Sequence, residues 1–150
     1  MEQGDSLKLD VFRPRRQGIR KVLGDLEADV MESVWLHSEG NTVSVRDVFE
    51  HMQSARKIAY TTVMSTMARL ARKGLLQVDT AEQSYRYRPR FTEDALSREI
   101  VQSVIAGLMM NFEGETLSYL DTLRAGETEP NTVRRELRGE IQRRREAREP

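Results

Sequence analysis

The sequence contains no cysteine, few aromatic residues and no long apolar run. Disulfides, zinc–thiolate sites and thiol nucleophiles are therefore excluded. No stretch approaches the roughly 18 consecutive apolar residues from which a membrane-spanning helix is recognised. The first ten residues carry three acidic side chains and no apolar segment, which is not the pattern of a secretory signal. We therefore expect a cytoplasmic protein without membrane insertion.

Groups that could carry catalysis are also scarce. The two histidines, His37 and His51, stand apart in the sequence, and neither has Asp, Glu or His neighbours at the spacing of metal ligands. No Gly-rich phosphate loop, Ser-His-Asp set or pair of catalytic carboxylates stands out. The sequence therefore predicts a protein that is not an enzyme and that uses no metal or cofactor.

Charge is balanced over the whole chain but not along it. The 150 residues hold 24 Lys and Arg against 24 Asp and Glu. Residues 43–90 carry nine basic and four acidic side chains, whereas residues 91–129 carry two and eight. A basic segment beside an acidic one indicates that only one part of the chain faces a polyanion.

Apolar residues recur at helical spacing in three short segments. The first segment begins at Asp25, the second follows Ser44, and the third runs over residues 59–73 and ends at Gly74. The period then changes to two, which predicts a hairpin that ends at Pro89. Three helices followed by a basic hairpin are typical of a winged helix-turn-helix, in which the third helix enters the major groove of DNA.

The exposed face of the third helix and the hairpin supply the candidate DNA contacts. Small hydroxyl side chains reach phosphates or base edges without bulk, and an arginine can read guanine through two hydrogen bonds. The alternative is an ordinary solvated surface. The residues predicted to contact DNA are Thr61, Thr62, Ser65, Arg69 and Arg72 of the helix, and Arg86 and Arg88 of the hairpin.

A long helix capped by Thr92 is expected to follow, with a break at Gly114 and a shorter helix after it. Its apolar stripe could pack within one chain, but few other apolar partners remain, which favours a homodimer interface. The residues predicted for dimerisation are Leu96, Ile100, Val104, Leu108, Leu117 and Leu120.

The predicted fold class is therefore mainly α with a small β-hairpin. Residues 1–22 form either a flexible basic arm or a solvated disordered leader, and the winged helix-turn-helix domain spans 23–91. A helical dimerisation region occupies residues 92–125, and a charged tail, either weakly helical or disordered, occupies 126–150.

Four blocks of sequence resemble the penicillinase-repressor family of bacterial regulators. They are LGDLEADVM at 23–31, AYTTVM at 59–64, RLARKGL at 69–75 and YRYRP at 85–89. Four blocks in order and at the right spacing are far more specific than any one of them. With the helices up to about residue 123, the likeness covers roughly two-thirds of the chain.

The resemblance implies a homodimeric repressor on a palindromic operator in double-stranded DNA, controlling a β-lactamase-type or cell-envelope-stress gene. It also implies a role in antibiotic resistance and a membrane sensor-protease system that cuts an Asn-Phe bond. Asn111-Phe112 stands at the matching place, although Asn111 could simply end a helix. A copper-responsive branch of the family uses cysteine pairs, which are absent here. The competing hypothesis is a winged-helix protein-interaction module without specific DNA binding.

Overall fold

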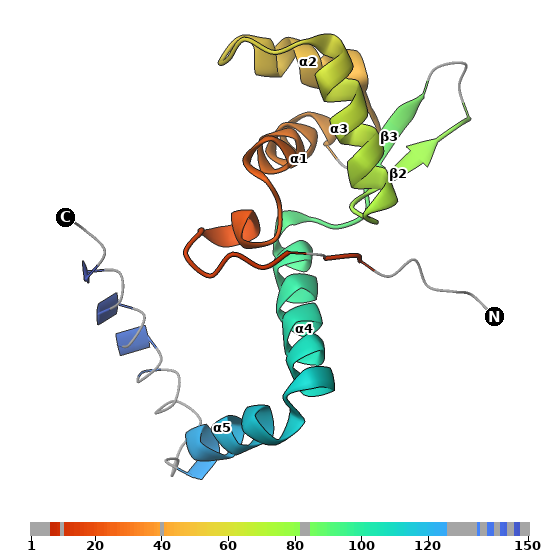
Figure 1. Cartoon of the computed structure of the whole chain (residues 1–150). Coiled ribbons are helices and arrows are strands. Elements are labelled where there is room, and N and C mark those ends of the chain that lie inside the picture. Colours follow the sequence, from red (N-terminus) through yellow and green to blue (C-terminus); the bar gives the residue numbers. More distant parts are fainter. Residues whose placement is uncertain are drawn as a thin grey trace. The chain divides into compact units, whose positions relative to one another are not determined.

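The computed structural model describes residues 7–9, 11–39, 41–81 and 85–125, and isolated residues of the tail (135, 138–139, 142–143 and 146–147). The chain forms two compact units, residues 1–104 and 105–150. No helix of the described part is long and apolar enough to cross a bilayer. In chain order, the elements are the 3₁₀ helix η1 (Gly18–Lys21), α1 (Asp25–Ser38), β1 (Val43–Ser44), α2 (Val45–Gln53), α3 (Tyr60–Arg72), β2 (Leu76–Asp79), β3 (Arg86–Pro89), α4 (Glu93–Asn111) and α5 (Glu113–Ala125) (Figure 1).

The helix that the sequence places after Ser44 starts there because of a capping box. The Ser44 hydroxyl accepts a hydrogen bond from the Asp47 backbone N–H at 3.1 Å, and the Asp47 carboxylate accepts one from the Ser44 backbone N–H at 2.9 Å. Hydrogen bonding by the backbone and side chain of Ser44 lowers the pKa of the Asp47 carboxyl, with a smaller contribution from nearby Arg86. Asp47 is therefore ionised at neutral pH and fixes the start of α2.

The end of α3 is equally well defined by local chemistry. Gly74 has a φ of 83°, a left-handed conformation that glycine adopts without steric cost. The Leu75 backbone N–H then donates to the Leu70 carbonyl at 2.9 Å, which is the long bond of a Schellman motif. Leu75 turns back into the core, so the chain leaves α3 directly towards the wing.

The wing is a three-stranded antiparallel sheet with strand order β1-β3-β2. The sequence predicted a two-stranded hairpin, and the structure adds β1, which pairs Val43 with Tyr87. Tyr87 is buried, and this burial raises the pKa of its phenol. A strand of two residues is too short to show an alternating pattern in the sequence. Its pairing partner, β3, is also distant along the chain.

The first half of α4 belongs to the core of the first unit. Leu96 has no exposed surface, and Ile100 is buried in the same apolar cluster as residues of α1, α3 and β3. Both were predicted to lie in a dimer interface. Their burial within one protomer leaves little area to bury against a second copy, and both contribute to the core of the first unit.

Part of the predicted flexible arm is folded onto the first unit. The Arg13 backbone N–H donates to the Lys21 carbonyl at 2.6 Å, and Arg20 pairs with Asp29 of α1 at 2.5 Å. Hydrogen bonding to Asp29 raises the pKa of Arg20. Val22 is buried in the core. The basic side chains of this segment thus contact the acidic start of α1. Counting charges segment by segment along the sequence did not predict these pairs.

The long helix begins as predicted, because the Thr92 hydroxyl accepts from the Ala95 backbone N–H at 3.2 Å. Its end differs from the prediction. The break lies at Phe112, between α4 and α5, and Gly114 is inside the first turn of α5. The Phe112 carbonyl accepts from the Thr116 backbone N–H at 2.9 Å, so this residue starts the second helix. Most of the predicted tail lies outside the described residues.

Candidate DNA interface

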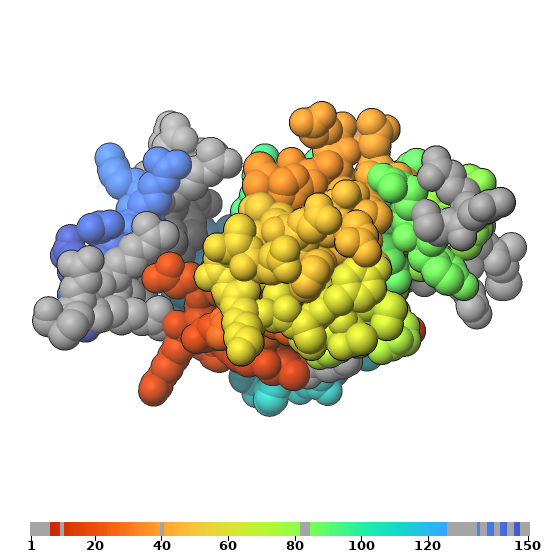
Figure 2. Space-filling model, turned by 90° about the horizontal axis from the view of Figure 1, so that it is seen from above, coloured from red at the N-terminus to blue at the C-terminus, as the bar shows by residue number. Residues whose placement is uncertain are grey.

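The helix α3 separates a buried face from a polar one. Val63, Thr66, Met67 and Leu70 are buried against the rest of the unit. Figure 2 shows α3 (yellow to yellow-green) beside α2, with the β3 strand of the wing in green on the other side. The residues predicted to contact DNA from this helix, all of them exposed, are Thr61, Thr62, Ser65, Arg69 and Arg72.

The hydroxyl groups on this face keep their ability to bind a ligand. Ser65 Oγ donates to the Thr62 carbonyl at 3.1 Å within the helix. A hydroxyl that donates one hydrogen bond still has two lone pairs to accept others. Thr61 and Thr62 carry exposed side chains with the same capacity. Small groups of this kind allow the helix backbone to approach DNA closely.

The start of α3 carries a cationic and aromatic cluster that sequence reasoning missed. The Arg46 guanidinium lies 6.0 Å from the centroid of the Tyr60 ring, and Tyr60 meets Phe49 edge to face at 5.5 Å. Arg46 and Tyr60 are exposed. Arg46 is one of the basic residues counted in the segment 43–90. Only the packing of α2 against α3 brings it next to Tyr60.

The two wing arginines have different surroundings. Arg86 donates to Thr42 Oγ1 at 2.8 Å and to the Thr42 carbonyl at 3.0 Å, and it lies 4.0 Å from Asp47. Its side chain is 29% exposed, whereas that of Arg88 is 53% exposed and, among the residues that the structure describes, lies 3.5 Å from Asp79. Arg88 is therefore presented to solvent, and Arg86 ties the wing to the start of α2.

Replacing Arg86 by alanine is expected to destabilise the first unit by about 2 kcal/mol, because two charge-assisted hydrogen bonds to Thr42 are lost. Denaturant unfolding of the full chain measures this. The matched control is Arg88→Ala, for which we expect a change within about 0.5 kcal/mol. Equal stability of the two variants would show that the Thr42 contacts contribute nothing to the fold.

The end of α4 and all of α5 expose apolar side chains. No residue of α5 is buried. Of the residues predicted for dimerisation, Val104 is half-buried in the first unit, while Leu108, Leu117 and Leu120 are exposed in the second. Ile105, Met110, Phe112 and Tyr119 extend the same exposed apolar set. Exposed apolar side chains gathered in this way are typical of interaction surfaces.

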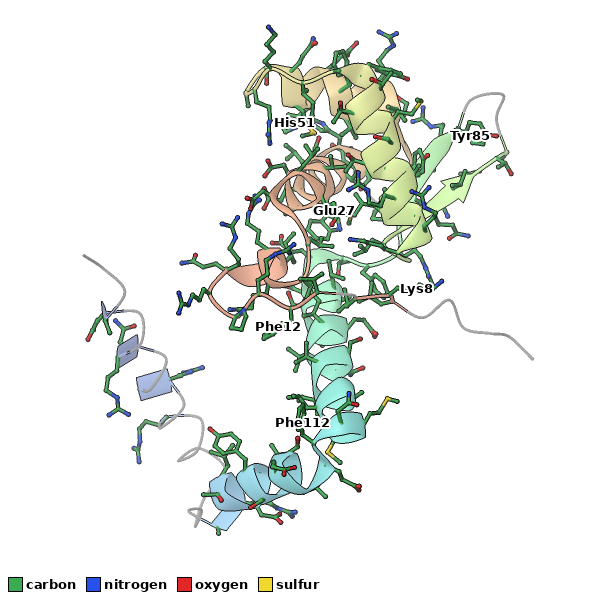
Figure 3. The ribbon with its side chains drawn as sticks, in the orientation of Figure 1. Lys8, Phe12, Glu27, His51, Tyr85 and Phe112 are labelled. Atoms are coloured by element: carbon green, nitrogen blue, oxygen red, sulfur yellow. The ribbon has the colours of Figure 1, made fainter. Side chains whose placement is uncertain are left out.

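The Asn111-Phe112 bond lies between the two helices of this surface (Figure 3). Both residues are exposed, and Asn111 Nδ2 donates only to the Gly107 carbonyl of its own helix, at 3.2 Å. The peptide bond between them thus joins the last residue of α4 to a residue outside any helix. Cleavage there remains a prediction.

The structure brings the two histidines together although they are separated in sequence. The His37 and His51 rings meet edge to face at 4.5 Å, and His51 Nδ1 lies 2.9 Å from Ser33 Oγ. Among the residues that the structure describes, no group of three or more His, Asp or Glu could hold a metal. The two rings join α1 to α2 at the surface.

This chain is similar to a known protein family and to curated relatives. Residues 23–139 match the family described as "Penicillinase repressor". Two proteins named "Transcriptional regulator BlaI", from the CDC 1551 / Oshkosh and ATCC 25618 / H37Rv strains of Mycobacterium tuberculosis, are each 39% identical over 89 residues. The match covers 59% of this chain and 57% of each relative, so the chain spans little more than half the length of the curated relatives it matches. Since the family match takes in most of the sequence, the chain belongs to the penicillinase repressor family, whose members are transcriptional regulators and not enzymes.

Proposed function

We propose that this chain is a DNA-binding transcriptional repressor that acts as a homodimer on a palindromic operator. The observation that carries the proposal is the exposed polar face of α3 beside the solvent-facing Arg88 of the wing. This face has the residue types that read a major groove, and the chain belongs to a family of repressors.

Each part of the surface has a separate role in this proposal. Thr61, Thr62 and Ser65 contact phosphates and base edges, while Arg69 and Arg72 read bases. Arg88 binds a phosphate beside the groove. Arg86 supports the wing through Thr42, and its own contact with DNA is secondary.

The apolar surface of α4 and α5 pairs two copies. Leu108, Leu117 and Leu120 form its centre in the proposed dimer, and Val104 lies at its edge. Such a dimer carries two winged units, one for each half-site of a palindromic operator.

Release of the operator is proposed to follow cleavage at Asn111-Phe112 by a membrane sensor-protease system. The exposure of both residues between two helices is compatible with proteolysis. The regulated gene is proposed to be of the β-lactamase or cell-envelope-stress type, by analogy with the family.

Base reading and phosphate binding are separated by two arginine variants. Arg69→Ala is expected to lose about 1–3 kcal/mol of affinity for the operator and less for scrambled DNA. Arg88→Ala is expected to weaken both equally and to lower the slope of log affinity against log salt by about one phosphate. Gel shifts in graded salt, with the promoter of its own gene and a scrambled duplex, measure both effects.

Arg98→Ala, which removes an exposed arginine of α4 outside the candidate interface, is the control and should match the unmodified protein. Binding without any dependence on salt or sequence would contradict the proposal and favour a protein-interaction module.

A further inference from the structure

We propose that Glu27 of α1 is a positioning residue for sequence discrimination. In this view its buried carboxylate holds Arg69 in place for base reading and keeps Lys73 from making sequence-independent contacts with phosphates. The inference rests on the proposed function and deepens it, since it assigns a role to a residue outside the exposed face of α3.

The carboxylate of Glu27 lies between α1 and the C-terminal half of α3 (Figure 3). Glu27 is only 5% exposed. Its Oε1 and Oε2 lie 2.8 and 2.9 Å from Lys73 Nζ, and Oε2 accepts the Gly24 backbone N–H at 3.2 Å. Arg69 Nη1 approaches Oε1 at 3.8 Å. One acidic group therefore faces two cations of the helix that is proposed to read DNA.

Burial explains why these contacts persist. A carboxylate removed from water is strongly disfavoured unless cations and hydrogen bonds compensate it. Lys73 compensates it directly, and Arg69 adds a longer-range attraction. The ion group thus has a definite geometry that a pair of exposed side chains would not keep.

One edge of the Arg69 guanidinium lies near Glu27, and half of the side chain is exposed. The contact with Glu27, at 3.8 Å, is longer than a hydrogen bond. A guanidinium carries five N–H donors, so one edge can face Glu27 while another binds guanine through two hydrogen bonds. Restricting this long side chain before binding lowers the entropy lost on contact with the correct base.

Glu27 has the opposite effect on Lys73, because it keeps this side chain from contacting DNA. The Lys73 ammonium group donates hydrogen bonds to both carboxylate oxygens of Glu27, and its side chain is only one-quarter exposed. A lysine released next to the DNA-facing helix would bind any phosphate, and such contacts carry no sequence information. Glu27 therefore raises the ratio of operator affinity to non-specific affinity through Arg69, and through Lys73 it limits the affinity for DNA of any sequence.

The test is Glu27→Gln in the full chain, with binding measured on operator and scrambled duplexes over a range of salt. Glutamine keeps the shape and one acceptor but removes the charge. We expect tighter binding to scrambled DNA, a salt slope steeper by about one phosphate, and a specificity ratio lower by roughly tenfold. Glu32→Gln is the matched control, because Glu32 is an exposed acid of α1 that pairs with Arg20 and not with α3. Its specificity ratio should stay unchanged.

A double-mutant cycle separates positioning from a merely structural role. In an Arg69→Ala background, Glu27→Gln should lower the specificity ratio no further, because the group that it positions is gone. An equal loss in both backgrounds would overturn the inference. The inference would also fail if Glu27→Gln left the ratio unchanged while Arg69→Ala reduced it.

Loss of the buried charge could also unfold the protein, so a compensated variant completes the design. Glu27→Gln combined with Lys73→Met removes both partners and leaves no uncompensated buried cation. Its salt slope should return to the original value, while its specificity ratio stays low. A slope that remained steep would show that Lys73 is not the masked cation. If the unmodified chain itself did not prefer its operator, the proposed function would fail instead.

Discussion

Replacing Leu96 by aspartate is expected to unfold the first unit of the protein. Leu96 is 0% exposed and packs in the apolar cluster shared by α1, α3 and the wing. A carboxylate at this position would lie among apolar side chains, which costs several kcal/mol against a total stability of about 5–15 kcal/mol. Loss of the cooperative thermal transition, followed by circular dichroism, is the measurement.

The matched control is Leu117→Asp, at an exposed position of α5. In a single protomer the new carboxylate at this position is exposed to water, so the first unit should remain folded. If Leu117 lies in the dimer interface, this variant should be a folded monomer by light scattering. A folded monomer from Leu96→Asp would instead return that leucine to the dimer interface.

Truncation of the chain after Asn111 is expected to lower operator affinity by roughly 10²–10⁴. The 1–111 fragment keeps every element of the winged unit but loses α5 with Leu117 and Leu120. Two half-sites bound by linked units gain from a high effective concentration, which independent monomers do not have. Gel shifts and light scattering measure the affinity and the oligomeric state on the same samples.

Truncation after Ala125 is the control, because it removes the tail and leaves α5 complete. That fragment should bind the operator as a dimer with nearly unchanged affinity. A 1–111 fragment that stayed dimeric and bound equally well would mean that cleavage at Asn111-Phe112 is not the switch. The tail after residue 125 would then be the next candidate for regulation.

The helices of the winged unit could be predicted because their signals are local. The apolar spacing of α2, the hydroxyl of Ser44 and the glycine at position 74 each act within a few residues. The exposed face of α3 follows from the same periodicity, since the residues that are not buried must face solvent. The family resemblance drew on four blocks that include parts of α1, α3 and β3, and the match to the family confirmed it.

The pairing of β1 with β3 could not be predicted in this way. It joins residues more than 40 positions apart, and two residues show no alternation. The surroundings of Arg86 could not be predicted for the same reason. Its partners Thr42 and Asp47 come from the segment that this pairing brings alongside the wing.

The sequence by itself determined which residues are apolar and at what spacing, and hence the helices, the wing and the family. Only the tertiary structure decided which neighbour covers each apolar or charged group. Leu96 and Leu117 have the same side chain, but the first is buried in its own protomer and the second is exposed. Glu27 is an unremarkable acid in a helical pattern until folding places it against Lys73. Burial and ion pairing depend on contacts between distant segments, and periodicity within one segment carries no information about them.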